Sequence, residues 1–170
     1  MPSLIANRTY AELSIGDSAT LHREVRETDI QLFAAVSGDI NPAHLDAAYA
    51  ADTPFQGCIA HGIFSAALIS TLLGVHLPGP GTIYLGQTLR FLRPVRAGDR
   101  LEASVTVREK HDDKGRVVFD CLVVNQEGRK VLSGEAEVIA PASPVRREAV
   151  VPPPVTLGGS PYLRHEQTRG

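Results

Sequence analysis

Residues 37–44 place two side chains that can exchange protons on one short, constrained segment. The segment reads Ser-Gly-Asp-Ile-Asn-Pro-Ala-His, so the carboxylate of Asp39 and the imidazole of His44 are five residues apart. Gly38 permits backbone dihedrals that other residues resist, and Pro42 fixes its own φ angle. A loop stiffened in this way can hold a proton acceptor and a proton donor on either side of one water molecule. That chemistry suits the addition of water to a double bond, or its removal.

Purely structural roles could explain the same two residues. An aspartate that follows a glycine can cap the next helix, and a histidine among alanines can be a partly buried side chain with satisfied hydrogen bonds. An ordinary helix connection does not need Gly38, Asn41 and Pro42 together, which favours the chemical interpretation. Both explanations stay open on this segment alone.

Length and composition predict one globular domain. The chain has 170 residues, of which 43% are hydrophobic and 21% charged, enough to bury a core without metals or disulfides. Its formal net charge of −2 and the lack of a Lys/Arg run argue against a nucleic-acid partner.

Cysteine usage and apolar segments favour a cytoplasmic protein. Cys58 and Cys121 lie in apolar surroundings and are expected to be buried, reduced thiols. The first ten residues lack an apolar signal core, and the longest apolar stretch, residues 63–73, is interrupted by hydroxyl side chains and is too short to span a bilayer. No membrane contact is expected.

The first half of the chain predicts a strand followed by helices. Residues 18–25 alternate apolar and polar side chains, as a half-buried strand does. Thr28 and Gln31 resemble a capping box that opens a helix ending at Gly38. The alanine-rich run 43–51 predicts a short second helix, which the following Asp-Thr-Pro ends. Asp39 is therefore expected just past a helix end.

The second half predicts a buried helix and an antiparallel sheet. Residues 62–73 are apolar or small around the whole helical wheel, so this helix is expected to run through the core. Four strand-like runs follow, separated by turn residues. These runs are residues 83–91, 99–109, 116–125 and 130–139. The order predicts an α+β fold in which an antiparallel sheet wraps around a long buried helix.

Composition changes at Pro141. From this residue onward prolines are spread among Ser, Gly, Arg and Glu. We therefore expect a domain over residues 1–140 and a proline-rich C-terminal tail over residues 141–170, either a flexible linker or an arm lying on the surface.

Four segments carry a resemblance to a known family. They are residues 36–44, residues 59–62 (Ile-Ala-His-Gly), residues 84–87 (Tyr-Leu-Gly-Gln) and residues 91–99. Together they resemble the MaoC-like (R)-specific enoyl-CoA hydratases, which have the hotdog fold. The resemblance covers roughly residues 10–140 and leaves out the tail. Its order of strands and helices agrees with the pattern above.

The resemblance implies a role for three residues. Asp39 and His44 match the pair that holds the water added across the 2,3-double bond of a trans-2-enoyl thioester, giving an (R)-3-hydroxyacyl product. Gly62 matches the residue whose backbone N–H points at the thioester carbonyl. Elementary electrostatics agrees, because a helix N-terminus offers unpaired N–H groups and partial positive charge to an oxygen that becomes negative.

Other residues are candidates for substrate binding. Ser70 matches a polar residue near the pair, although its hydroxyl could equally bond to its own helix. Asn41 is expected to orient the loop. The candidates for the acyl tunnel are Phe55, Ile59 and Leu85, and those for the coenzyme A phosphates are Arg90, Arg93 and Arg96. For each arginine a solvated strand face is at least as good an explanation.

The resemblance also implies partners. Coenzyme A is the expected acyl carrier, with no separate cofactor, and the chain is expected to form a homodimer with sites at the interface. His61 is expected to be structural rather than catalytic, because it precedes a buried helix and the reaction does not require it. His22, His76 and His111 are scattered without zinc-ligand spacing, so no metal is expected.

Two other functions remain open. A hotdog acyl-CoA thioesterase would direct water at the thioester carbonyl instead of C3, and the spacing of Asp39 and His44 favours the hydratase over it. A catalytically silent acyl-binding module, tethered through the tail to another enzyme, is compatible with the prolines after residue 141.

Overall fold

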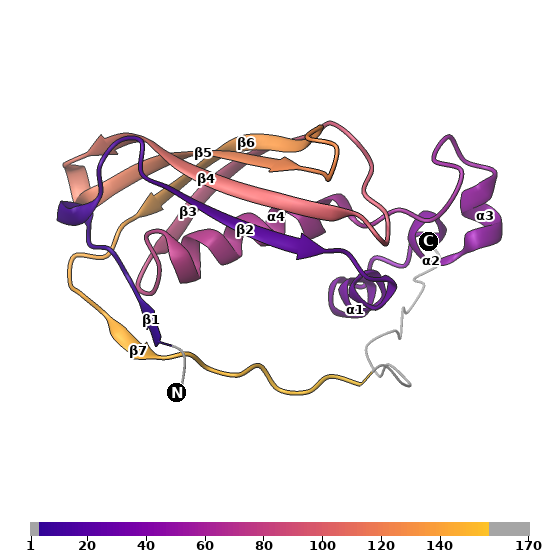
Figure 1. Cartoon of the computed structure of the whole chain (residues 1–170), viewed down its shortest axis with the longest axis horizontal. Helices are drawn as coiled ribbons and strands as arrows, with labels where there is room; N and C mark the ends of the chain where they lie inside the picture. The colour runs from indigo at the N-terminus through magenta and orange to yellow at the C-terminus, as the bar shows by residue number, and fades with distance from the viewer. Residues whose placement is uncertain (1–3, 157–170) are drawn as a thin grey trace, which may run out of the picture.

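A five-stranded antiparallel sheet curved around one helix forms the centre of the computed structural model, which describes residues 4–156 (Figure 1). The strands are β2 (Ser18–Glu24), β3 (Ile83–Phe91), β4 (Arg100–His111), β5 (Arg116–Val124) and β6 (Lys130–Ile139). They lie in the order β2-β4-β5-β6-β3, so that β2 and β3 are the edges. Helix α4 (Gly62–Thr71) continues into the π-helical turn η2 (Leu72–His76). This is the α+β arrangement that the sequence predicts.

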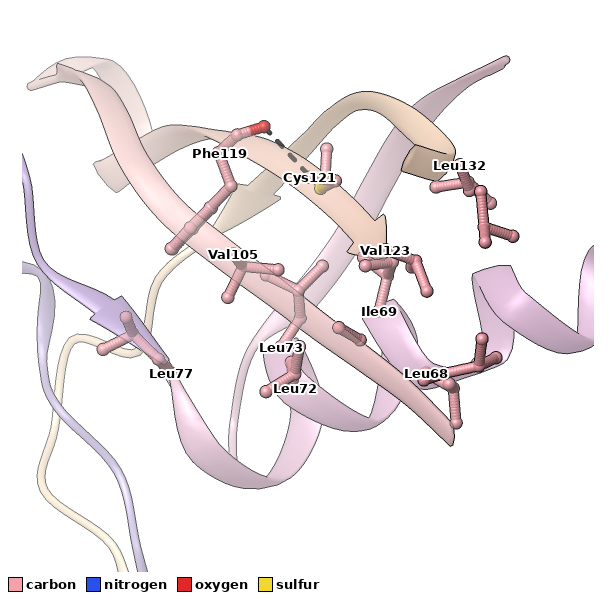
Figure 2. Packing of buried hydrophobic residues seen from close by; sticks show 14 of the residues in the cluster. Leu68, Ile69, Leu72, Leu73, Leu77, Val105, Phe119, Cys121, Val123 and Leu132 are labelled. Atoms are coloured by element: carbon pink, nitrogen blue, oxygen red, sulfur yellow. Dashed lines mark hydrogen bonds between the residues drawn. The ribbon is translucent and has the colours of Figure 1, made fainter. Parts of the chain in front are cut away.

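The hydrophobic core lies between α4 and the sheet face that it covers. Every second residue is buried from Leu101 to Val107 on β4 and from Val117 to Val123 on β5, because successive side chains of a strand point to opposite faces. Figure 2 shows Val105, Phe119 and Val123 of these strands packed with residues of α4 and η2. Cys121 belongs to this core, and burial raises the pKa of its thiol to about 11. Cys58 is only half-buried, which corrects the expectation for that residue.

Helix α4 is buried on one side only. Phe64, Leu68 and Ile69 face the core, whereas Ile63 is 52% exposed and Ser70 is exposed as well. The sequence predicts a helix that is apolar all round and enclosed. In a single chain the sheet covers one side, and the opposite side faces outward.

The segment between β2 and α4 contains three helices. They are α1 (Glu27–Ser37), α2 (Pro42–Leu45) and α3 (Ala47–Ala51). The single helix predicted over residues 43–51 is thus two short ones, because the Asp46 carboxylate accepts the N–H groups of Ala48 and Tyr49, each at 3.0 Å, and starts a new helix.

Helix α1 also begins differently from the prediction. Its start is closed by Asp29, whose Oδ2 accepts the backbone N–H of Arg26 at 3.0 Å. The helix therefore begins at Glu27, one residue before the predicted Thr28–Gln31 capping box. Its end at Gly38 is as predicted.

The start of the predicted tail is attached to the N-terminal segment. Strands β1 (Leu4–Ala6) and β7 (Arg146–Glu148) form a separate two-stranded ribbon, and the buried Pro141 accepts the backbone N–H of Tyr10 at 2.8 Å. Two short 3-10 helices, η1 (Tyr10–Glu12) and η3 (Asp113–Gly115), complete the elements. Residues 157–170 of the tail lie outside the described residues. Across residues 4–156 the longest apolar helix is too short to cross a membrane.

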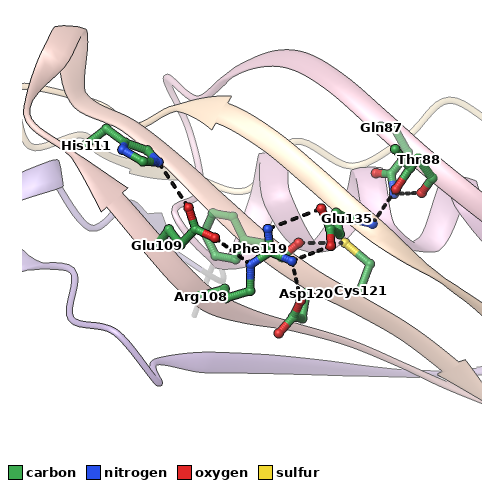
Figure 3. A network of polar contacts seen from close by, with 9 residues as sticks. All are labelled: Gln87, Thr88, Arg108, Glu109, His111, Phe119, Asp120, Cys121 and Glu135. Atoms are coloured by element: carbon green, nitrogen blue, oxygen red, sulfur yellow. Dashed lines mark hydrogen bonds and ion pairs between the residues drawn. The ribbon is translucent and has the colours of Figure 1, made fainter.

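The outer face of the sheet is charged. Arg108 on β4 pairs with Asp120 on β5 at 3.2 Å and with Glu135 on β6, as Figure 3 shows. The guanidinium lowers the pKa of the Glu135 carboxyl through this hydrogen bond. Ion pairs this exposed add little to the free energy of unfolding. Because of these charges the outer face of the sheet is solvated, and the hydrophobic core forms on the opposite face, against α4.

The close approach of β3 and β6 leaves no room for a side chain at Gly134. A Cβ there would lie 1.9 Å from the carbonyl oxygen of Thr88 on β3. Gly134→Ala should lower the free energy of unfolding by about 2 kcal/mol or more, because the two strands would have to separate. Urea denaturation measures the change. Gly86→Ala on β3 is the matched control, since its Cβ would meet no atom within 4 Å, and an equal loss in both variants would contradict this explanation.

Candidate active site

The end of α1 positions Asp39. Gly38 adopts the left-handed conformation with φ 75°, and its N–H donates to the carbonyl of Ala34 at 2.9 Å, which ends the helix. The chain then turns, and Oδ1 of Asp39 accepts the N–H of Asn41 at 3.2 Å. The Asp39 side chain is 53% exposed, so its other oxygen, Oδ2, is available to water.

Helix α2 positions His44. Asn41 caps this helix, its Oδ1 accepting the N–H of Ala43 at 3.0 Å, and Pro42 occupies the first helical position. Nδ1 of His44 lies 2.7 Å from the carbonyl oxygen of Ile59. A carbonyl only accepts, so Nδ1 carries a proton, which leaves Nε2 as the nitrogen that can accept one.

The side chains of Asp39 and His44 are separated by a distance that one water molecule can bridge. Nε2 of His44 is 4.0 Å from Oδ2 of Asp39, which is too long for a direct hydrogen bond. Two hydrogen bonds of about 2.8 Å each can meet at one oxygen between groups at this separation. The pair can therefore accept both hydrogens of a single water molecule and leave a lone pair of its oxygen free.

His61 completes a cluster with this pair. Its ring lies against that of His44, with centroids 3.8 Å apart, and its Nε2 donates to the backbone carbonyl of Asp39 at 2.9 Å. One ligand-type atom from each of Asp39, His44 and His61 lies within 4.8 Å of the others, a grouping that the sequence spacing does not reveal. These atom types could hold a transition metal. However, His61 uses Nε2 on the Asp39 carbonyl and its Nδ1 is buried, so Asp39 and His44 are the two members of the group with an open ligand atom.

Helix α4 begins beside this cluster. His61 is its N-cap and Gly62 its first residue, and the first N–H groups of a helix have no acceptor within the helix. Gly62 and His44 line the same cavity, which has a volume of about 330 Å³. A Cβ on Gly62 would lie 3.0 Å from the ring of Phe91, so only glycine leaves that ring undisturbed.

The cavity brings together some of the predicted binding residues. Phe55, Ile59 and Arg93 line it. Leu85, Arg90 and Ser70 are exposed and do not line it, and their assigned roles stay predictions. Arg96 instead donates from its guanidinium to the carbonyl of Phe55.

The lining includes residues that the sequence analysis did not assign to the site, among them Ser65 and Phe91. Ser65 is buried and lines the cavity one helical turn after Gly62, a spacing that could have identified it. Phe91, at the end of β3, also lines the cavity. Its proximity to Gly62 results from the curvature of the sheet and has no local signal.

Fold and site together define a class of protein, and comparisons with known proteins agree with it. The MaoC like domain family matches residues 12–127. The chain belongs to this family, and its likeness to solved R-hydratases confirms the expected hotdog fold.

Particular relatives are similar over most of their length. The (R)-specific enoyl-CoA hydratase of Rhodospirillum rubrum is 46% identical over 78% of this chain and 92% of that protein. The 3-hydroxybutyryl-CoA dehydratase of Methylorubrum extorquens is 40% identical over 88% of this chain and 92% of that protein. The solved structure of the unliganded R-hydratase PhaJ1 from Pseudomonas aeruginosa superposes with a TM-score of 0.87, at 52% identity over 92% of this chain and all of that one.

Proposed function

We propose that this protein is an (R)-specific enoyl-CoA hydratase, which adds water to trans-2-enoyl-CoA to give (R)-3-hydroxyacyl-CoA and also catalyses the reverse dehydration. The observation that carries the proposal is the 4.0 Å gap between Asp39 Oδ2 and His44 Nε2, beside the helix start that Gly62 forms. The names of the similar proteins, an (R)-specific enoyl-CoA hydratase and a 3-hydroxybutyryl-CoA dehydratase, support the same chemistry.

The pair activates the water. With both hydrogens directed to Asp39 and His44, the oxygen of the bridging water attacks C3 while one of the pair accepts a proton. The pair then delivers a proton to C2, so that water adds across the double bond and both side chains return to their original charge. Asp39 and His44 act as one unit, because the same water molecule bridges both side chains.

The start of α4 stabilises the charge that forms. As the nucleophile adds to C3, electron density moves through the conjugated system to the thioester oxygen. The N–H of Gly62, with the partial positive charge of the helix N-terminus, can donate to that oxygen. Glycine allows the thioester to approach the backbone closely.

The remaining contacts concern the carrier and the acyl chain. Phe55 and Ile59 offer apolar surface in the cavity. Arg93 also lines the cavity and is exposed to solvent, so its guanidinium can pair with a coenzyme A phosphate. The reaction as written needs no further cofactor, because water and the enoyl thioester supply every atom of the product.

A homodimer fits the surface of the chain. Edge strand β3 has an unpaired side, and Ile83, Leu85 and Phe91 on this strand are each about half exposed. The outward side of α4 adds Ile63, which is 52% exposed. A second copy paired along β3 would bury these side chains and satisfy the open backbone groups of the strand.

The product identifies the reaction. Purified protein incubated with a series of trans-2-enoyl-CoA substrates of increasing chain length should cause loss of the enoyl absorbance and yield the (R)-3-hydroxyacyl product, separated by chiral chromatography. Release of free thiol without hydration would instead indicate a thioesterase. An (S) product would contradict the proposal.

Removal of either member of the pair should abolish most activity. Asp39→Asn and His44→Ala should each lower kcat for crotonyl-CoA hydration by about two to four powers of ten, because the water loses its proton acceptor. Asp39 lies on a loop with its side chain 53% exposed, so thermal unfolding of Asp39→Asn should change little. The His44 side chain on α2 is only 11% exposed, so circular dichroism must first show that His44→Ala is folded. Asp52→Asn, an exposed aspartate after α3, is the control. Near-normal activity of Asp39→Asn would refute the assigned role.

The space around Gly62 gives a separate test of the helix start. Gly62→Ala should lower kcat/KM by roughly tenfold, because the added Cβ, 3.0 Å from the Phe91 ring, displaces this ring within the cavity. The double variant with Phe91→Leu should recover part of the loss. Gly74→Ala in η2 is the control, since its Cβ would meet nothing within 4 Å. Unchanged kinetics in Gly62→Ala would show that the ring contact is not important.

A further inference from the structure

His61 is a nearly fully enclosed imidazole beside the pair. It is 3% exposed and lies between two aromatic neighbours, with its ring centroid 3.8 Å from that of His44 and 5.0 Å from that of Phe33. Because it caps α4, it also directly precedes Gly62. A single side chain thus contacts His44 and adjoins the helix start.

His61 also holds the loop that carries Asp39. Its Nε2 donates to the Asp39 carbonyl at 2.9 Å across 22 residues of sequence. The other hydrogen bonds of residues 38–42 are to residues within the segment 34–46. Within residues 4–156, His61 therefore makes the one hydrogen bond that ties this loop to the rest of the molecule.

The hydrogen-bond pattern assigns opposite tautomers to the two stacked rings. His44 has its proton on Nδ1, because this nitrogen faces the carbonyl of Ile59. His61 has its proton on Nε2, which faces the carbonyl of Asp39, and its Nδ1 is buried without a partner in the described structure. A proton on that Nδ1 would be a buried donor with no acceptor, which is unfavourable.

On the basis of the hydratase function proposed above, we propose that His61 is a positioning residue, which sets the distance between Asp39 and His44 by holding the Asp39 backbone while its ring supports His44. His61 lines the cavity, but its Nε2 is occupied by the Asp39 carbonyl and its Nδ1 is buried, so we assign it no proton transfer. The bridging water needs both acceptors at the correct separation, and displacement of a reacting group by about 1 Å can reduce the rate about a hundredfold.

Two substitutions separate the hydrogen bond from the ring. His61→Phe keeps an aromatic ring against His44 and Phe33 but removes the donor, whereas His61→Gln keeps an N–H donor at a similar reach. We expect His61→Phe to lower kcat for crotonyl-CoA hydration by roughly ten- to a hundredfold with little change in KM, and His61→Gln to recover most of this loss. The same two substitutions at the exposed His22 on β2 are the controls.

The outcomes distinguish this role from general support of the fold. Equal losses in His61→Phe and His61→Gln, or a rise in KM without a fall in kcat, would overturn the role of the hydrogen bond. Full activity of His61→Phe would overturn it as well. An inactive wild-type protein would instead refute the hydratase function.

A second measurement does not depend on activity or on the folding of any variant. Long-range ¹H–¹⁵N NMR spectra of the wild-type imidazoles should show the Nε2–H tautomer for His61 and the Nδ1–H tautomer for His44. An Nδ1–H tautomer at His61, which leaves Nε2 without a proton to donate to Asp39, would overturn the proposal, whatever the catalytic activity of the protein.

Discussion

The site depends on four consecutive backbone positions, residues 59–62, that join the loop, the sheet and the helix. The carbonyl oxygen of Ile59 accepts a hydrogen bond from the ring of His44. The backbone N–H of Ile59 donates to the carbonyl of Ala43 at 3.2 Å. The N–H of Ala60 donates to Val95, which precedes β4, at 2.7 Å. His61 then reaches the backbone of Asp39, and Gly62 begins α4. Because each residue of this short segment has a different partner, moving it would disturb every part of the site together.

The buried side of α4 and the exposed Asp39 loop contribute to the site in different ways. The buried side of α4 packs on β4 and β5 and fixes the helix start, while the Asp39 side chain remains open to water at a loop. A carboxylate buried completely would lose its hydration, and one on an unsupported loop would not keep its distance to His44. The outward side of α4 and the open edge of β3 add a third region, which fits the proposed contact with a second copy.

Local sequence signals predicted which segments form helices and strands, but they missed the residues at which two of the helices begin. Alternation over residues 18–25 and four strand-like runs bounded by turn residues identified the five strands of the main sheet, and Gly38 marked the end of α1. The division of residues 43–51 into two helices was missed, because the Asp46 cap competes with the helix propensity of the alanines around it. Ser65 and Phe91 were missed because a cavity is defined by residues from separate elements.

The sequence by itself placed Asp39 and His44 on one short turn, since Gly38, the Asn41 cap and Pro42 act over a few residues. It also determined, through the order of the strand-like runs and the apolar run at residues 62–73, that an antiparallel sheet would cover a helix. Only the tertiary structure decided the role of His61, the state of the His44 ring and the contact of Gly62 with Phe91. Those features join residues 15 to 29 positions apart, and their distances follow from the packing of α4 on the sheet.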